Sequence, residues 1–142
     1  MSDRQGGCLC GAIRYRVSTE PAMAGNCYCR DCQLATGSAF ATIFGVPGDA
    51  LHIERGTPAE WSVTGVSGGQ VTRAFCPTCG TPLFSRSEFT PDLAFIKLTT
   101  LDDPDSVQPE TNFWTNSAPA WAPIAHDLQS FGTQPADPRD EA

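Results

Sequence analysis

The seven cysteines of this chain constrain its fold more than any other feature of the sequence. They fall into three short groups, at positions 8 and 10, at positions 27, 29 and 32, and at positions 76 and 79. Cysteines one or two residues apart rarely meet the geometry of a disulfide with each other. Metal ligation therefore explains the spacing, although three disulfides and one free thiol remain an alternative.

The sequence predicts a cytoplasmic protein. The stretch "MSDRQGGCLCG" lacks an apolar run, and no later segment approaches the ~20 apolar residues that a membrane span needs. Thiols stay reduced in the cytoplasm, which again favours metal over disulfides. The net charge is −7 with only nine Lys and Arg residues, so we expect neither a nucleic-acid partner nor a membrane partner.

The pattern of the remaining residues predicts a small all-β domain. A chain of 142 residues is about the size of one domain, and apolar and polar residues alternate with a period of two. Clusters of Gly and Pro separate the segments, and "TGVSGGQ" is typical of a hairpin loop. The predicted strands, short and antiparallel, are 12–17, 38–46, 50–56, 59–64, 70–76, 82–87 and 93–101.

One short helical turn is expected among these strands. The segment "RDCQLATG" (30–37) fits a helix, with Gly37 at the position of a C-terminal cap. We expect a single zinc-binding domain over residues 1–132. The polar, acidic and Pro-containing segment 133–142 is expected to be a disordered tail.

Two of the cysteine pairs can form a closed zinc site. The turn "CPTCG" (76–80) follows a predicted strand, and Gly80 permits the backbone angles that point both sulfurs at one ion. The pair in "CLCG" (8–11) supplies two more sulfurs. Zinc with Zn–S bonds of about 2.3 Å holds four sulfurs roughly 3.8 Å apart. We predict a structural zinc site made of Cys8, Cys10, Cys76 and Cys79.

The remaining three cysteines, Cys27, Cys29 and Cys32, leave the fourth position of a zinc ion to be filled. Structural zinc is enclosed by protein ligands, whereas catalytic zinc keeps three of them and one open position. The fourth ligand is therefore either exchangeable or a distant side chain. The candidate side chains are His52, His126 and Asp31.

Spacing permits two other interpretations. Cys29 and Cys32 could join Cys76 and Cys79 in a four-cysteine ribbon, although the 43 residues between the pairs (33–75) exceed the usual 15–20. The order of "HIE" (52–54) and "CPTC" loosely matches the H-x-E…P-C-x-x-C signature of zinc deaminases. Here, however, the proline follows the first cysteine.

A zinc ion held by three thiolates favours thiol chemistry. Its net charge of −1 weakens its power to acidify water, so hydrolysis is not expected. A soft, sulfur-rich ion can instead accept one more thiolate and present it as a nucleophile. We therefore expect a small thiol to add to a small electrophile, or the adduct to be cleaved in reverse.

Three motifs resemble a known family in their order and separations. These motifs are "GGCLCGAIRY", "CYCRDCQLATGSAFA" and "FCPTCGTPLF", and the resemblance covers roughly residues 5–131. The family is that of the glutathione-dependent formaldehyde-activating enzymes (GFA), which includes centromere protein V. The resemblance implies a β-tent-type fold and two zinc ions, a structural one on the four-cysteine set and a catalytic one on Cys27, Cys29 and Cys32. It also implies a carbon–sulfur lyase acting on glutathione and formaldehyde.

Four residues depart from the family's pattern. Tyr28 and Gln33 stand where the family often has His and Arg, and "NFWTNSAPAW" has Asn112 and Ala118 at places that are otherwise polar or basic. Losing a cation disfavours glutathione, whose carboxylates would be held by Arg. A different small thiol or another electrophile is left open.

Other residues have a functional and a structural interpretation. Arg30 and Arg73 could bind a carboxylate or could be ordinary surface arginines. Trp114 and Trp121 could form the wall of a pocket or belong to the core. Tyr28 and Asp31 are the nearest candidates for proton transfer at the three-cysteine cluster. Two alternatives to an enzyme also stand: a non-enzymatic zinc-scaffolded interaction module and a thiol redox-responsive protein. The sequence does not determine the oligomeric state.

Overall fold

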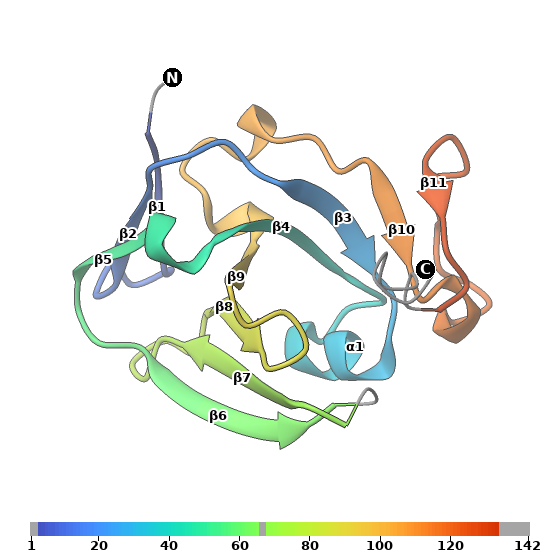
Figure 1. The fold of residues 1–142 in the computed structure, drawn as a ribbon, viewed down its shortest axis with the longest axis horizontal. Coiled ribbons are helices and arrows are strands. Elements are labelled where there is room, and N and C mark those ends of the chain that lie inside the picture. The colour runs from blue at the N-terminus through green and yellow to red at the C-terminus, as the bar shows by residue number, and fades with distance from the viewer. Residues whose placement is uncertain (1–2, 66–67, 134–142) are drawn as a thin grey trace.

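A computed structural model describes residues 3–65 and 68–133 of the chain (Figure 1). Strands dominate it, as the sequence predicted. They are β1 (Arg4–Gly7), β2 (Arg14–Val17), β3 (Met23–Cys27), β4 (Ala41–Pro47), β5 (Leu51–Arg55), β6 (Ala59–Thr64), β7 (Gln70–Phe75), β8 (Pro82–Ser87), β9 (Leu93–Lys97), β10 (Thr111–Phe113) and β11 (Gln129–Ser130). The α-helix is α1 (Arg30–Thr36), and the short 3₁₀ turns are η1 (Gly48–Ala50), η2 (Leu98–Thr100), η3 (Pro104–Ser106) and η4 (Thr115–Ser117).

These strands form two sheets. A three-stranded sheet has the order β1-β2-β5, and an eight-stranded sheet has the order β11-β10-β3-β4-β9-β8-β7-β6. The pairing is antiparallel as predicted, except that β10 lies parallel to both β3 and β11. The all-β fold with one short helix is confirmed.

All seven predicted strands are present, two of them (β6 and β8) with the predicted bounds and five with shifted ends, and four strands were not predicted. The missed β3 reads "MAGNC" and is almost wholly buried, so it shows no alternation of apolar and polar residues. Its Gly25 admits β10, because a Cβ there would lie 2.6 Å from the Phe113 ring and from the Thr111 carbonyl oxygen. At the other end of the chain, the predicted tail 133–142 falls, apart from Thr133, outside the described residues.

The helix α1 begins and ends as its sequence predicts. The Cys29 sulfur accepts a hydrogen bond from the Cys32 backbone N–H at 3.4 Å, which caps the first turn. Gly37 takes the left-handed conformation, and its N–H donates to the Gln33 carbonyl at 2.7 Å. No helix in the described part of the chain has the length and apolar character needed to cross a bilayer.

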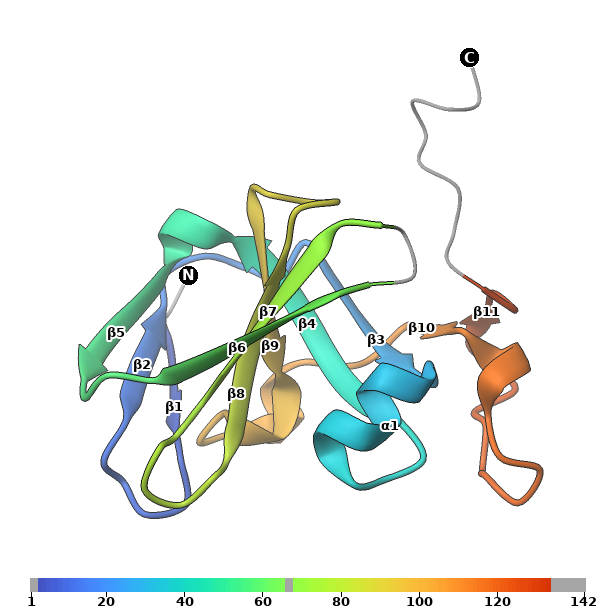
Figure 2. The ribbon, with the colours of Figure 1, turned by 90° about the horizontal axis from the view of Figure 1, so that it is seen from below.

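The two faces of the eight-stranded sheet have different surroundings. One face carries side chains such as Phe44 and Ile96, which are fully buried in the main core together with Tyr15 and Val17 of β2 and with Ile13, the residue before β2. Burying each large apolar side chain contributes about 1.5–3 kcal/mol, so this core stabilises the packing of the two sheets. The three-stranded sheet and α1 lie on opposite sides of β8 and β9 (Figure 1; Figure 2).

A buried polar network joins β4, β3 and β10. The Thr42 hydroxyl donates to Asn26 Oδ1 at 2.7 Å, and Asn26 Nδ2 donates to Asn112 Oδ1 at 3.1 Å. Asn112 Nδ2 in turn donates to the Ala125 carbonyl at 2.9 Å and to Ser130 Oγ at 3.1 Å. Asn112 has no exposed surface, so its role is to fix the parallel strand β10 and the segment after it.

Replacing Asn112 with Ala is expected to destabilise the fold. Asn26 Nδ2 and the Ala125 carbonyl would lose their partner while buried, at a cost of about 2–4 kcal/mol in the free energy of unfolding. Urea denaturation measures this loss. Asn116→Ala, at an exposed position close by, serves as the control and should change the free energy by less than about 0.5 kcal/mol. Equal effects of the two substitutions would contradict a structural role for Asn112.

Candidate metal centres and the adjoining pocket

The seven cysteines gather into two clusters. Within each cluster all sulfur atoms lie within 4.8 Å of one another, and the clusters are Cys8, Cys10, Cys76 and Cys79, and Cys27, Cys29 and Cys32. All seven are free thiols, so the disulfide alternative is wrong. The four-cysteine ribbon is also wrong, because its two pairs lie in different clusters. Both clusters could hold a metal ion.

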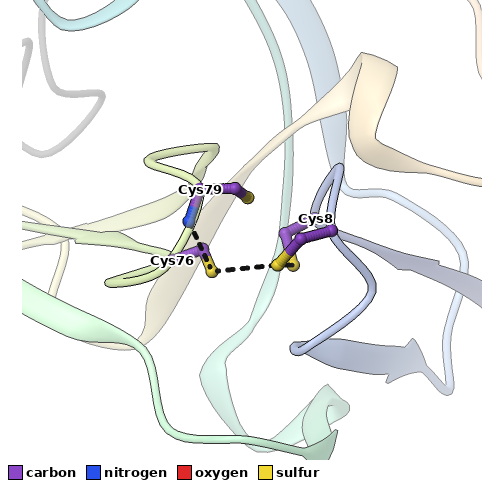
Figure 3. A group of neighbouring side chains, drawn as sticks. Cys8, Cys76 and Cys79 are labelled. Atoms are coloured by element: carbon purple, nitrogen blue, oxygen red, sulfur yellow. Dashed lines mark hydrogen bonds between the residues drawn. The ribbon is translucent and has the colours of Figure 1, made fainter.

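The four-cysteine cluster joins the two sheets. Cys8 and Cys10 lie in the loop after β1, and Cys76 and Cys79 lie in the turn between β7 and β8, where Gly80 has φ +79°. Figure 3 shows Cys8 facing Cys76 and Cys79 across the cluster. The Cys8–Cys10 and Cys10–Cys76 sulfur distances are 3.7 and 3.8 Å, close to the roughly 3.8 Å expected around tetrahedral zinc.

Hydrogen bonds to these sulfurs favour the thiolate form, which is the form that binds metal. The Ile13 N–H donates to Cys8 Sγ at 3.2 Å, and the backbone N–H of Cys79 donates to Cys76 Sγ at 3.4 Å. The Thr81 hydroxyl oxygen lies 3.2 Å from Cys79 Sγ. Hydrogen bonds from the side chain and the backbone of Thr81 are the main cause that lowers the pKa of Cys79 to about 5. The donor set therefore fits a closed four-thiolate site.

The three-cysteine cluster lies where β3 meets α1. Cys27 ends β3, Cys29 caps the helix and Cys32 lies in its first turn, so the strand and the helix fix all three positions. Cys27 and Cys32 are buried and Cys29 is half-buried. Hydrogen bonds from the Cys27 and Cys32 thiols are the main cause that lowers the pKa of Cys29 to about 2, and the charge of Arg73 adds to this.

No His, Asp or Glu of the described residues completes the three-cysteine cluster. His52 lies on β5 in the other sheet, with its Nε2 3.1 Å from Ser18 Oγ. His126 is exposed, and Asp31 lies in the first turn of α1 without joining the cluster. The three side chains proposed from the sequence as a fourth ligand therefore do not fill that position.

The residues that replace the family's His and Arg hold the cluster's loop in place. The Tyr28 hydroxyl donates to the Pro123 carbonyl at 3.0 Å, and the ring is buried, which raises its pKa. Gln33 Nε2 donates to the carbonyls of Tyr28 at 2.9 Å and Ser117 at 3.0 Å. Arg30 donates to Gln33 Oε1 at 3.0 Å. Tyr28, Gln33 and Arg30 thus have structural contacts, and the carboxylate-binding role considered for Arg30 gains no support.

Aromatic residues after β10 pack beside the three-cysteine cluster. Phe113 and Trp114 contact it. Trp114 has φ 61°, which makes it the one non-glycine residue with positive φ in the described segments. Such a conformation costs energy and is found preferentially at functional sites. Trp121, by contrast, is 76% exposed and belongs to neither the core nor a pocket wall.

A pocket of about 370 Å³ lies between α1 and strands β6 to β9. Its lining includes Ala35, three residues after Cys32 on α1, and also Trp61, Arg73, Phe84 and Lys97. Lys97 is only 6% exposed. Burial lowers its pKa, while the neighbouring thiolates of Cys32, Cys27 and Cys29 oppose that shift. No role for Lys97 was predicted from the sequence, although its position in the apolar segment "LAFIKLTTL" is a signal of a buried charge.

Comparison with known proteins gives a family and a fold. The model of the family described as "Glutathione-dependent formaldehyde-activating enzyme" matches residues 3–117. A crystal structure of a Rhodobacter sphaeroides protein is 23% identical in sequence, with a TM-score of 0.58 over 74% of this chain and 91% of that one. At this identity the likeness concerns the fold alone. None of the curated proteins compared with the chain matches it.

The two clusters are expected to differ in what their loss does. Cys76→Ala should abolish cooperative folding, because binding of a closed structural metal contributes directly to folding free energy. Cys29→Ala should lower the bound zinc from two equivalents to one and leave the thermal transition within a few degrees. Elemental analysis and calorimetry measure both effects. Thr78→Ala, exposed in the same turn as Cys76, is the control and should keep both ions. Unfolding of Cys29→Ala as complete as that of Cys76→Ala would contradict this division.

Proposed function

The chain belongs to the glutathione-dependent formaldehyde-activating enzyme family, and from this premise we propose that it is a zinc-dependent carbon–sulfur lyase. It would join a small thiol to a small electrophile such as formaldehyde, or cleave the adduct. The observation that carries the proposal is the cluster of three cysteine sulfurs that gains no fourth ligand from the described residues. A pocket large enough for a small molecule is lined by Lys97, whose charge also acts on the three cysteines.

The donor atoms of both clusters suit zinc. Thiolates are soft ligands that favour zinc over the hard cations, and the sulfur distances in the four-cysteine cluster match a tetrahedral ion. Cys8, Cys10, Cys76 and Cys79 would hold a structural ion, and Cys27, Cys29 and Cys32 a catalytic one. Zinc on the three-cysteine cluster would supply a site that lowers the pKa of a thiol and holds it as a nucleophilic thiolate.

The reaction needs no oxidant and no further reactant. The thiol loses its proton, and a sulfur lone pair forms the new bond to the carbonyl carbon of the aldehyde. The π pair of the C=O bond moves to oxygen, which takes up a proton, and the product is an S-(1-hydroxyalkyl) thioether. Cleavage is the same process in reverse, with the C–S pair returning to sulfur.

Residues around the cluster would favour negative charge at the reacting sulfur. Arg73 and Lys97 both act electrostatically on the cysteine thiolates. Lys97 is buried, so its charge is screened less than that of a surface lysine. Phe113 and Trp114 cover part of the cluster and restrict water around it. These side chains would orient and stabilise a bound thiolate before it attacks.

Cobalt substitution tests whether the three-cysteine site accepts a thiol. Addition of a small thiol to the Co²⁺-loaded protein should increase the thiolate-to-cobalt charge-transfer absorption by one further ligand per chain. The same thiol should exchange with ¹³C-formaldehyde at least tenfold faster than without the protein, measured by NMR exchange spectroscopy.

Cys29→Ala should lose both signals, whereas Thr78→Ala should keep them. An unchanged spectrum together with uncatalysed exchange, for glutathione and for a panel of smaller thiols, would show that the site has no exchangeable position. The zinc-scaffolded interaction module would then be the better description.

A further inference from the structure

The pocket lined by Lys97, whose charge also acts on the three-cysteine cluster, has an unusual lining. Six of its ten lining residues are apolar, and they are Ala35, Trp61, Ala74, Phe75, Pro82 and Phe84. Two of the remaining four are cations, Arg73 and Lys97, and the one acidic residue, Glu60, is exposed. An apolar wall with two adjacent cations is suited to an anion that carries an apolar body.

Strand register places the two cations on the same face as the cysteines. Cys27 pairs with Ala41, and Ile43, two residues along β4, pairs with Lys97. Residues two apart on a strand share a face, and so do directly paired residues. On β9, Phe95 shares the face of Lys97.

The same face continues across β8 to the far side of the pocket. Phe95 pairs with Ser85, Ser85 with Arg73, and Arg73 with Trp61. Cys27, Lys97, Arg73 and Trp61 therefore share one face of the sheet. Two other lining residues, Ala74 and Phe84, pair with each other on the core face, where Phe84 also pairs with Ile96.

The two cations lie at different distances from the cysteines. Lys97 is on β9, two strands from Cys27 on β3, and Arg73 is on β7, two strands further. Neighbouring strands lie about 4.8 Å apart, so each of these steps spans at most about 10 Å in a flat sheet. Lys97 thus faces both the thiolates and the pocket, whereas Arg73 belongs mainly to the pocket and its Trp61 wall.

Neither cation has a carboxylate partner in residues 3–65 and 68–133. The ion pairs found there involve Arg4, Arg14 and Arg16. Burying a charge such as Lys97 without an anion is costly, and the thiolates lie on only one side of it. The pocket side of Lys97 and the guanidinium of Arg73 remain available to a bound anion.

We propose that this pocket selects a small thiol, or its adduct, whose body is apolar and bears one carboxylate, with Arg73 and Lys97 as partners of that carboxylate. The inference rests on the proposed function and names the class of its substrate. The sulfur would reach the three-cysteine cluster, the carboxylate would lie between β9 and β7, and the apolar body would contact Trp61.

Glutathione fits this lining less well than a simple mercapto acid does. The tripeptide has two amides, an ammonium group and a second carboxylate, and a polar group buried without a partner costs affinity. The pocket volume of about 370 Å³ is also near the lower end of the roughly 300–1,000 Å³ typical of ligand pockets.

A rival explanation is that the cations only balance the charge of the metal site. Three thiolates and Zn²⁺ carry −1, and a fourth thiolate makes this −2. In that case Arg73 and Lys97 would strengthen the binding of every thiol equally, neutral or acidic. The ratio of affinities for an acid and its uncharged amide separates the two explanations.

The experiment compares 2-mercapto-3-phenylpropanoate with 2-mercapto-3-phenylpropanamide on the Co²⁺-loaded protein, using the charge-transfer absorption as readout. The acid should bind about tenfold to a hundredfold more tightly than the amide, as expected for a charge-assisted pair with Arg. Arg73→Gln should bring this ratio close to one, because the acid loses the partner of its carboxylate and the amide has no such partner to lose. Arg86→Gln, an exposed arginine over the Phe84 ring, is the matched control and should keep the wild-type ratio.

A sulfur-free acid tests the pocket without the metal. Calorimetry with 3-phenylpropanoate should detect binding to the wild type and its loss in Arg73→Gln and Lys97→Met. Equal affinity of acid and amide in the wild type, an equal effect of Arg86→Gln, or tighter binding of glutathione than of the mercapto acid would overturn the inference. If no thiol changes the cobalt absorption, the proposed function is overturned instead. The inference about the pocket is then tested by 3-phenylpropanoate alone: binding supports it and absence of binding overturns it.

Discussion

The convergence of four cysteine sulfurs from the two sheets is the constraint on which the rest of the fold depends. Cys8 and Cys10 follow the first strand of the small sheet, whereas Cys76 and Cys79 form the turn between β7 and β8 of the large one. A metal ion there would fix the two sheets at one point. Backbone N–H groups of Ile13 and Cys79 donate hydrogen bonds to the sulfurs at that point. The core then fills the space between the sheets, and the opposite face of the large sheet stays free to carry a site.

The pleat of the large sheet makes this division of labour possible. Ile96 and Lys97 are neighbours in sequence, yet Ile96 is fully buried in the core with Phe44, and Lys97 faces the thiolates and the pocket. The same alternation on β7 sends Ala74 into the core and Arg73 to the other face. A change of register by one residue in either strand would exchange these roles, so the core that stabilises the sheet also fixes the position of both cations.

The sequence predicts the parts of the fold that depend on local pattern. Alternation identified seven strands, Gly37 identified the end of α1, and cysteine spacing together with the family resemblance indicated clusters of four and three. Long-range pairing was not accessible: β3 lacks alternation because it is buried on both sides, and its parallel partner β10 is only three residues long. Asn112 therefore looked like a substituted binding residue, although it belongs to a buried network. Arg73 was considered from the sequence as a carboxylate-binding residue, but no second cation was predicted beside it. That Lys97 lies on the same face as Arg73 follows only from the register of β7, β8 and β9.

The departures from the family's pattern have a common physical consequence. Gln33 and Asn112 stand where the family tends to have ionisable groups, and both use their amides to join backbone and side-chain partners of neighbouring segments. Ala118, at the end of η4, offers no charge at all. Positive charge beside the three-cysteine cluster comes instead from two strands of the sheet, where it borders an apolar wall. A family can keep its metal ligands and change its substrate in this way, because sulfur atoms fix the chemistry while the sheet face next to them determines which molecule can reach it.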